Sequence, residues 1–182
     1  MNAIERLLNR LSTATLVLGA AATLLMMLHV VVDVIARVVF KRPVGGTLET
    51  VTYIWMVAVV FLPLAMVQRR RQQIIVELFS QVLPPRVLAL LDGIVAAIAC
   101  CFMLGLTWYS GHEAWAQTLI REAAPSPTSP VPIWPARWMV VAGAGLVAVY
   151  LALQSAADLR LAVTGKRSLT ADPAPGARLA EV

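Results

Sequence analysis

The sequence predicts an all-α integral membrane protein with four transmembrane helices and one amphipathic interfacial helix. Hydrophobic residues make up 59% of the 182-residue chain and charged residues only 14%, whereas soluble domains contain about 45–50% apolar and about 25% charged residues. The charged residues gather at the ends of four long apolar runs, because a charge is costly in the hydrocarbon of a bilayer. We expect one membrane domain over residues 1–164 and a polar, disordered tail over residues 165–182.

The first span is predicted over residues 13–40. A helix of this length extends about 42 Å at about 1.5 Å per residue. This exceeds the hydrocarbon thickness of about 30 Å, so we expect the helix to tilt or protrude. Arg6 and Arg10 precede the apolar run, as in a signal peptide. The run is nevertheless longer than a signal-peptide core of about 7–15 residues, and no small-residue cleavage site follows it. We therefore expect a retained first helix.

The other three spans are predicted over residues 48–67, 88–109 and 134–153, each close to the roughly 20 residues that a crossing needs. Pro63 lies inside the second span and predicts a kink there. The third helix is expected to continue beyond its apolar part, because residues 110–122 are polar at helical spacing and lack proline.

A proline-rich connection leads into the fourth span, and such segments are extended and stiff. Pro135 suits the first turn of a helix. Trp134 and Trp138 suit the aromatic belt at a membrane surface.

Residues 72–83, between the second and third spans, are predicted to form the interfacial helix. Their apolar residues recur at helical spacing and form one stripe: Ile74, Ile75, Leu78, Phe79, Val82 and Leu83. Arg69, Arg70 and Arg71 stand directly before the segment, where they suit contact with lipid headgroups at the membrane surface. We expect this helix to lie flat on the cytoplasmic face; the alternative is a plain loop.

The loop charges predict the orientation of the chain. Ten Lys and Arg residues lie on the side that holds both termini and the second connection, and five lie on the other side. Because cytoplasmic loops carry the excess of Lys and Arg, we expect both termini, and the tail with them, in the cytoplasm. The same clustering argues against nucleic acid as the reason for the net charge of +5, since the basic residues do not form an isolated face.

Three ionisable residues share one face of the first helix, because His29, Asp33 and Arg37 are spaced four residues apart. One interpretation is a proton or ion relay, which needs groups distributed through the depth of the membrane. We favour the other, an Asp33–Arg37 pair that joins the first helix to a neighbour, because the triplet lies in the outer half of one helix. Asp33 and Arg37 are therefore candidate structural or interface residues.

Glu49 is the third candidate structural or interface residue. It stands near the start of the second span, where a carboxylate meets the positive end of the helix dipole, with Thr47 as the expected N-cap. A pairing of Glu49 with Arg37 across the short first connection is an equally weighted and compatible alternative. Asp92 and Asp158, near the ends of the third and fourth helices, are interpreted as surface charges.

No catalytic, cofactor or metal site is predicted, and the chain is not expected to be an enzyme. The sequence lacks a nucleophile–base set, a phosphate-binding loop and a metal-ligand cluster. Haem between two histidines is disfavoured, because His29 and His112 differ in predicted depth by roughly 15 Å. Cys100 and Cys101 are interpreted as small, buried apolar side chains of the third span. The middles of the spans are too apolar for a substrate pathway.

A set of residues in the first two spans and the following segment carries a resemblance. The set comprises Asp33-Val34-Ile35-Ala36-Arg37-Val38-Val39-Phe40, Pro43, Thr47-Leu48-Glu49, Tyr53, Trp55, Arg69 to Arg71, Ile74-Ile75-Val76-Glu77-Leu78 and Pro84. It resembles the small membrane subunit of the tripartite ATP-independent periplasmic (TRAP) transporters, the DctQ-like family. Two positions depart from the usual pattern, since Gln73 stands where a histidine is usual and Glu77 where an aspartate is common.

This resemblance implies the small permease subunit of a sodium-coupled, binding-protein-dependent secondary transporter for organic acids in the bacterial inner membrane. In such a system a periplasmic substrate-binding protein captures the substrate and a large DctM-like membrane subunit carries it with sodium. The small subunit braces the static scaffold of the large one. The implied partners are these two proteins and membrane lipid, with no nucleic acid and no cofactor. The alternative is a self-contained four-helix membrane assembly or sensor module.

Overall fold

The computed structural model describes residues 3–70, 84–126 and 130–164. Arg71, the predicted interfacial helix over residues 72–83 and the predicted disordered tail over residues 165–182 lie outside the described residues. Within the described part, four helical segments are long and apolar enough to cross a membrane. They cover Arg6–Val39, Thr47–Arg69, Arg86–Leu119 and Trp134–Val163. The predicted all-α fold with four spans is confirmed.

The first two spans differ in regularity. The first is a single helix, α1 (Ala3–Val39). The second is divided into α2 (Thr47–Thr50), the π-helical turn η1 (Val51–Trp55), α3 (Met56–Phe61) and α4 (Leu64–Arg69). The helix is interrupted at Pro63, as predicted, because proline has no N–H to donate and its ring crowds the preceding turn.

The third and fourth spans are long, continuous helices, α5 (Pro85–Leu119) and α6 (Trp134–Thr164). The continuation of α5 beyond its apolar part confirms the prediction. Between them, β1 (Ala123–Ala124) pairs antiparallel with β2 (Val131–Pro132). This short pairing returns the chain to the start of α6.

The C-terminus of α5 is closed by a Schellman motif. The Glu122 N–H donates to the Gln117 carbonyl at 3.0 Å, and the Arg121 N–H donates to the Thr118 carbonyl at 3.2 Å. Arg121 adopts a left-handed conformation, with φ of 51°, at the position where glycine is usual. The motif reverses the chain immediately after the helix and so places Glu122 beside the first turn of α6.

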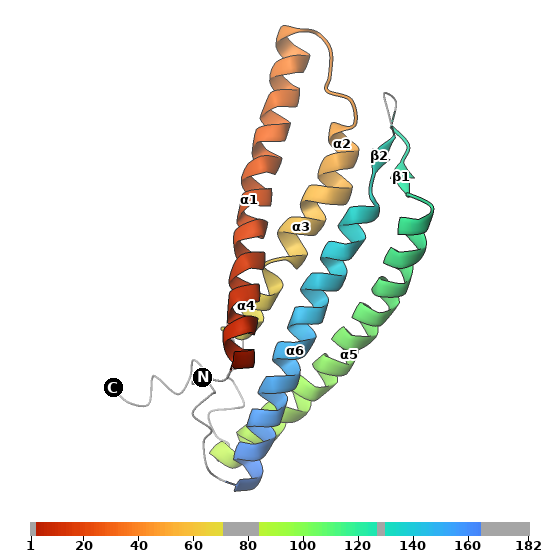
Figure 1. Cartoon of the computed structure of the whole chain (residues 1–182). Helices are drawn as coiled ribbons and strands as arrows, with labels where there is room; N and C mark the ends of the chain where they lie inside the picture. The colour runs from red at the N-terminus through yellow and green to blue at the C-terminus, as the bar shows by residue number, and fades with distance from the viewer. Residues whose placement is uncertain (1–2, 71–83, 127–129, 165–182) are drawn as a thin grey trace, which may run out of the picture.

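The four spans lie side by side in a row (Figure 1). α1 packs on the second span, the second span packs on α6, and α6 packs along most of α5. We name the end that holds the N-terminus of α1 and the C-terminus of α6 the terminal end. The opposite end, with residues 40–46, 120–126 and 130–133, is named the hairpin end. α1 and α5 therefore form the two edges of the row.

The core lies between neighbouring helices, and most of its buried apolar residues are alanines. One cluster comprises Leu8, Ala65, Cys100, Val147, Tyr150 and Leu151, and a second comprises Ala22, Ala58 and Leu62. The closest approach joins α6 to α3 at Gly143, where an added Cβ would collide with the Phe61 carbonyl and lie 2.8 Å from its carbon. Small residues allow helix backbones to approach in this way in membranes.

Candidate functional site

Asp33 and Arg37 fix the first connection at the hairpin end. Asp33 is buried, with 6% of the residue exposed. It accepts the Val44 N–H at 2.8 Å and an Arg37 guanidinium N–H at 2.7 Å. The ion pair that the spacing favours is therefore present, but Asp33 joins α1 to its own following loop, whereas we expected a bond to a neighbouring helix.

His29 has a different partner. The indole N–H of Trp55 donates to Nδ1 of His29 at 3.4 Å, which links α1 to the last residue of η1. Because a π-helical turn contains one additional residue, it rotates the side chains that follow, and Trp55 is the last residue of this turn. Asp33 is engaged by Arg37 and Val44. The triplet of ionisable residues is thus divided between two separate contacts, which argues against a continuous relay.

Glu49 lies half-buried in the first turn of α2, but Thr47 is not the N-cap, and this expectation is wrong. Gly46 occupies the cap position with φ of 77°, while the Thr47 hydroxyl donates to the Val44 carbonyl at 3.1 Å. A Cβ on Gly46 would lie 2.7 Å from a methyl of Val131 in β2. The positive φ and this contact together require glycine. Within the described residues, Glu49 forms no ion pair.

A second charged contact at the hairpin end was missed from the sequence. The Arg137 guanidinium donates to the two Glu122 carboxylate oxygens at 2.6 and 2.7 Å, the strong bidentate geometry of such pairs. The guanidinium holds the pKa of Glu122 below its usual range, against a smaller opposing effect of burial. The sequence did contain a signal for this ion pair, since the acid Glu122 follows one predicted helix and the base Arg137 lies in the first turn of the next.

Neutral polar contacts at the terminal end were also missed. Gln68 Nε2 donates to Gln154 Oε1 at 2.6 Å, and Gln154 Nε2 donates to the Gln68 carbonyl at 2.9 Å. The Tyr150 hydroxyl donates to the Ser12 hydroxyl at 3.2 Å, and Ser155 donates to the Gly93 carbonyl at 2.8 Å. These bonds connect α4, α1 and α5 to α6. Polar residues at the ends of apolar runs were the signal in the sequence.

The two aspartates interpreted as surface charges have different environments. Asp92 is exposed on α5. Asp158 on α6 is buried at 8% exposure and is engaged in an interaction, so the surface interpretation is wrong for this residue. α5 and α6 pack closely next to this residue, since a Cβ on Gly93 would lie 2.9 Å from the Leu159 side chain. A position that looks terminal in the sequence therefore becomes interior in the structure.

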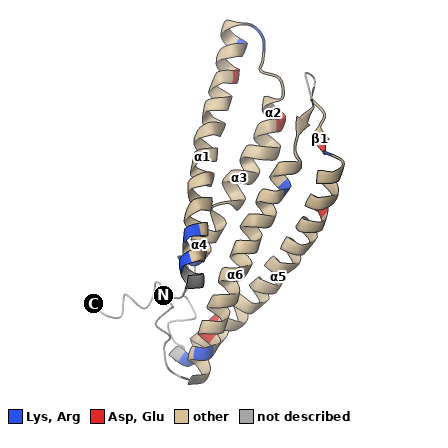
Figure 2. Ribbon diagram, viewed as in Figure 1, with Lys and Arg blue, Asp and Glu red and all other residues tan. Residues whose placement is uncertain are grey.

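The charged residues occupy the two ends of the helices, and the ribbon between them carries other residue types (Figure 2). Across residues 3–70, 84–126 and 130–164, no group of three His, Cys, Asp or Glu residues could hold a metal ion. His29 lies on α1 and exposed His112 on α5, at opposite edges of the row. The arrangement provides structural contacts at both ends and a large apolar exterior.

Of the three predicted membrane-surface arginines, Arg69 ends α4 and Arg70 follows it at the terminal end. Arg71 lies outside the described residues. The position of Arg69 and Arg70 at the end of an apolar span is compatible with a place at the membrane surface.

The comparisons with known proteins agree with this architecture. The family model for the tripartite ATP-independent periplasmic transporters, DctQ component, matches residues 26–161. The match begins within α1, covers the second and third spans completely and ends within α6. No curated protein and no solved structure matches the chain. Because the match covers well over half of the sequence, the chain belongs to the DctQ family, the small membrane subunits of TRAP transporters.

Proposed function

We propose that this subunit braces the large DctM-like membrane subunit of a sodium-coupled transporter that takes up organic acids. In this proposal a periplasmic binding protein delivers the acid, and the large subunit carries it together with sodium. The small subunit contributes rigid membrane surface and no transport pathway. Family membership supports the general role, and the shape of the helix row supports the specific one.

The observation that carries the proposal is the contrast between the edges and the interior of the row. In the most apolar windows of the edge helices, 11% of the residues are buried in α1 and 17% in α5, against 22% in the second span and 39% in α6. Two edge helices therefore offer most of their surface to their surroundings. In a closed bundle every helix would bury one face, so an open row is suited to lie against a larger partner.

The distribution of polar groups supports transport by the partner. The buried polar or charged residues of the described chain lie towards the two ends of the row: Ser12, Asp33, Gln68, Ser155 and Asp158. Transporters that bind anions and sodium hold them near the bilayer midplane, with polar side chains or broken helices. The interruption at Pro63 is packed against α1, since a Cβ on Gly19 would lie 2.7 Å from its ring. We therefore assign carriage of the organic acid to the large subunit.

We further propose that the terminal end faces the cytoplasm in the bacterial inner membrane. The excess of Lys and Arg on that side supports this orientation. Fusions of a fluorescent protein and of a periplasmic phosphatase to the C-terminus test it. Fluorescence without phosphatase activity is the expected result. Phosphatase activity without fluorescence would place the terminal end in the periplasm.

Co-purification tests the bracing role. The tagged chain is expressed with the large subunit from the same locus, and both are expected to elute together in a one-to-one complex. Sodium-driven uptake of organic acids should then require all three components. The self-contained module is the better explanation if the chain elutes alone and the large subunit transports at full rate without it.

Glu49→Ala sharpens this test. Glu49 is half-buried, next to Leu48 at 76% exposure, so we propose that it contacts the partner. The substitution should lower the yield of intact complex severalfold without changing substrate preference. Glu113→Ala is the matched control, because that carboxylate accepts a bond at 2.7 Å from Gln117 of its own helix. Equal yields for the two variants would remove Glu49 from the interface.

A further inference from the structure

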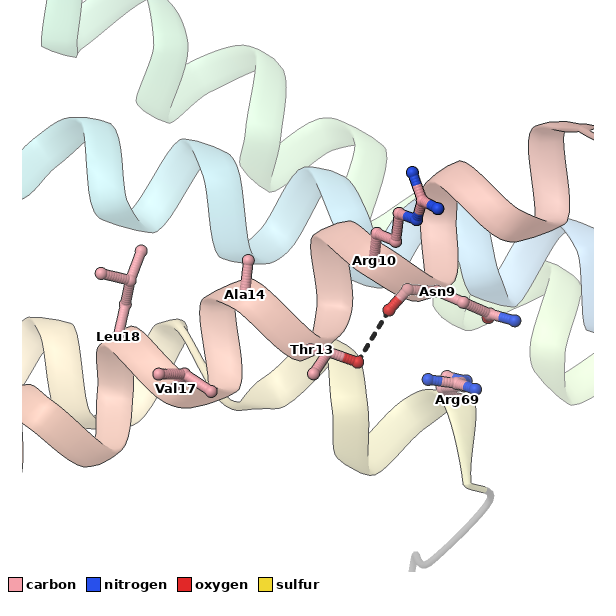
Figure 3. Close-up of a pocket in the computed structure, with 7 residues that line it drawn as sticks. All are labelled: Asn9, Arg10, Thr13, Ala14, Val17, Leu18 and Arg69. Carbon is pink, nitrogen blue, oxygen red and sulfur yellow. Dashed lines mark hydrogen bonds between the residues drawn. The ribbon is translucent and has the colours of Figure 1, made fainter.

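A groove at the terminal end combines two arginines with an apolar wall. It has a volume of about 700 Å³ and lies along α1 beside the end of α4. Arg10 and Arg69 line one end, together with Asn9. Figure 3 shows Ala14, Val17 and Leu18 continuing along α1 away from these polar residues. The groove therefore changes from cationic to apolar along the direction that crosses the membrane.

The partners of the two guanidinium groups decide whether these groups can bind a ligand. Within the described residues neither Arg10 nor Arg69 forms an ion pair with a carboxylate. Arg69 makes a weak contact with the sulfur of Met66 at 3.9 Å. In Figure 3 Asn9 lies between Arg10 and Arg69, so the three polar side chains gather at one end of the groove. Guanidinium groups bind phosphate oxygens through charge-assisted hydrogen bonds.

Asn9 and Thr13 complete the polar-to-apolar change. The side-chain oxygen of Asn9 lies 3.5 Å from the Tyr150 hydroxyl and shares the hydrogen that Tyr150 donates to Ser12. The two amide hydrogens of Asn9 remain for another acceptor. The Thr13 hydroxyl donates to the Asn9 carbonyl at 2.8 Å, as the dashed line in Figure 3 shows. Thr13 thus uses its donor within the helix, and the polar surface of the groove is concentrated at Asn9 and the arginines.

We propose that this groove binds a phospholipid with an anionic headgroup. The headgroup phosphate lies against Arg10, Arg69 and the Asn9 amide, and an acyl chain follows Ala14, Val17 and Leu18. From Arg10 to Leu18 the helix rises about 12 Å, enough to hold the upper part of an acyl chain. Two cations that have no carboxylate partner among the described residues favour a headgroup with a net negative charge.

The inference is independent of the bracing role, since it concerns one edge of the chain in any membrane. It also differs from general attraction of basic residues to the membrane surface. A general effect depends on the number of charges at the terminal end, whereas a site depends on which arginines are present and on the space beside them.

Native mass spectrometry of the full chain in detergent tests the proposal, with phosphatidylglycerol and zwitterionic phosphatidylcholine of equal chain length as probes. Phosphatidylglycerol should bind with at least about tenfold higher affinity, because each arginine contributes to attraction of an anionic headgroup. The double variant Arg10→Gln/Arg69→Gln should lose this preference. Arg6→Gln/Arg86→Gln removes the same charge from exposed positions outside the groove and should retain it.

Two further arms address the apolar wall and the headgroup. Ala14→Phe fills the groove without changing charge and should weaken phosphatidylglycerol binding severalfold, with helix content by circular dichroism unchanged. Inorganic phosphate at millimolar concentration should not displace the lipid. Equal binding of both lipids, equal loss in the two arginine double variants, full binding by Ala14→Phe, or displacement by phosphate would each overturn the proposal.

Discussion

The two ends of this protein are held together by different kinds of contact. At the terminal end, neutral hydrogen bonds connect helices that are distant in the sequence, such as Gln68 with Gln154, 86 residues apart, and Ser12 with Tyr150, 138 residues apart. At the hairpin end, charged pairs act locally: Asp33 and Arg37 are four residues apart, and Glu122 and Arg137 are 15 apart.

This difference has a physical reason. Burying a charge costs more than burying a hydrogen-bonded neutral group, so neutral amides and hydroxyls are suited to interhelical contacts inside the row. Each charged pair at the hairpin end keeps at least one partner partly exposed. The Arg137 and Glu122 side chains are 34% and 23% exposed, and Arg37 is 64% exposed beside the buried Asp33 at 8%. The terminal end therefore fixes which helices are neighbours, and the hairpin end fixes the path of each connection.

The largest effect is expected between the two ends, at Gly143. In Gly143→Ala the new methyl collides with the Phe61 backbone, so α6 and α3 must separate. This separation should also weaken the contacts at both ends. Overpacking of this kind costs about 1–3 kcal/mol. The midpoint of detergent-induced unfolding, followed by circular dichroism, should decrease. Gly105→Ala is the control, because nothing lies within 4 Å of its added methyl; equal destabilisation by both would refute the close crossing.

Gln68→Leu tests the terminal end. The substitution leaves the Gln154 side-chain oxygen without its 2.6 Å donor, and the expected loss of stability is about 1–2 kcal/mol. Combining it with Gln154→Leu removes the unpaired group and should cost less than the sum of the single changes. Gln117→Leu is the control, since Gln117 bonds within its own helix. Simple additivity in the double variant would show that the two glutamines do not interact.

The Glu122–Arg137 pair tests the hairpin end through pH. Because the pKa of Glu122 is lowered in the folded state from its ordinary value of 4.5, its contribution is present above about pH 4.5 and is lost as the pH falls through the lowered pKa. At pH 7, Glu122→Gln should cost about 1 kcal/mol or less, since the pair is partly exposed. The cost should vanish in acid. A cost for Glu122→Gln that is independent of pH would exclude the ion pair as its cause.

The smallest effect, a gain, is expected at Arg121. Its φ of 51° is strained for a residue with a side chain, and Arg121→Gly relieves this strain at the Schellman position of α5. Because glycine also gains freedom in the unfolded chain, the net stabilisation should be about 0.5 kcal/mol. Unfolding measurements that show a loss of stability would mean that the Arg121 side chain itself holds the connection.

The candidate site was only partly predictable. The spacing of Asp33 and Arg37 favours their ion pair, because residues four apart share a helix face. The same reasoning could not find Glu122 with Arg137, since their approach depends on how the Schellman motif and the β1–β2 pairing turn the chain. The N-cap was assigned to Thr47 because threonine is a common cap. In the structure Gly46 is the N-cap, at a position next to Val131 of β2. This neighbour cannot be found from the sequence alone.

The sequence by itself determined the four spans, the interruption at Pro63, the extension of α5 and the family. These features depend on local composition and on apolar length, which a lipid environment constrains strongly. Only the tertiary structure decided that the helices form a row, that Asp158 is buried and that Gln68 meets Gln154. Those outcomes depend on which faces of similar apolar helices pack together, and small residues such as Gly143 select them by steric fit.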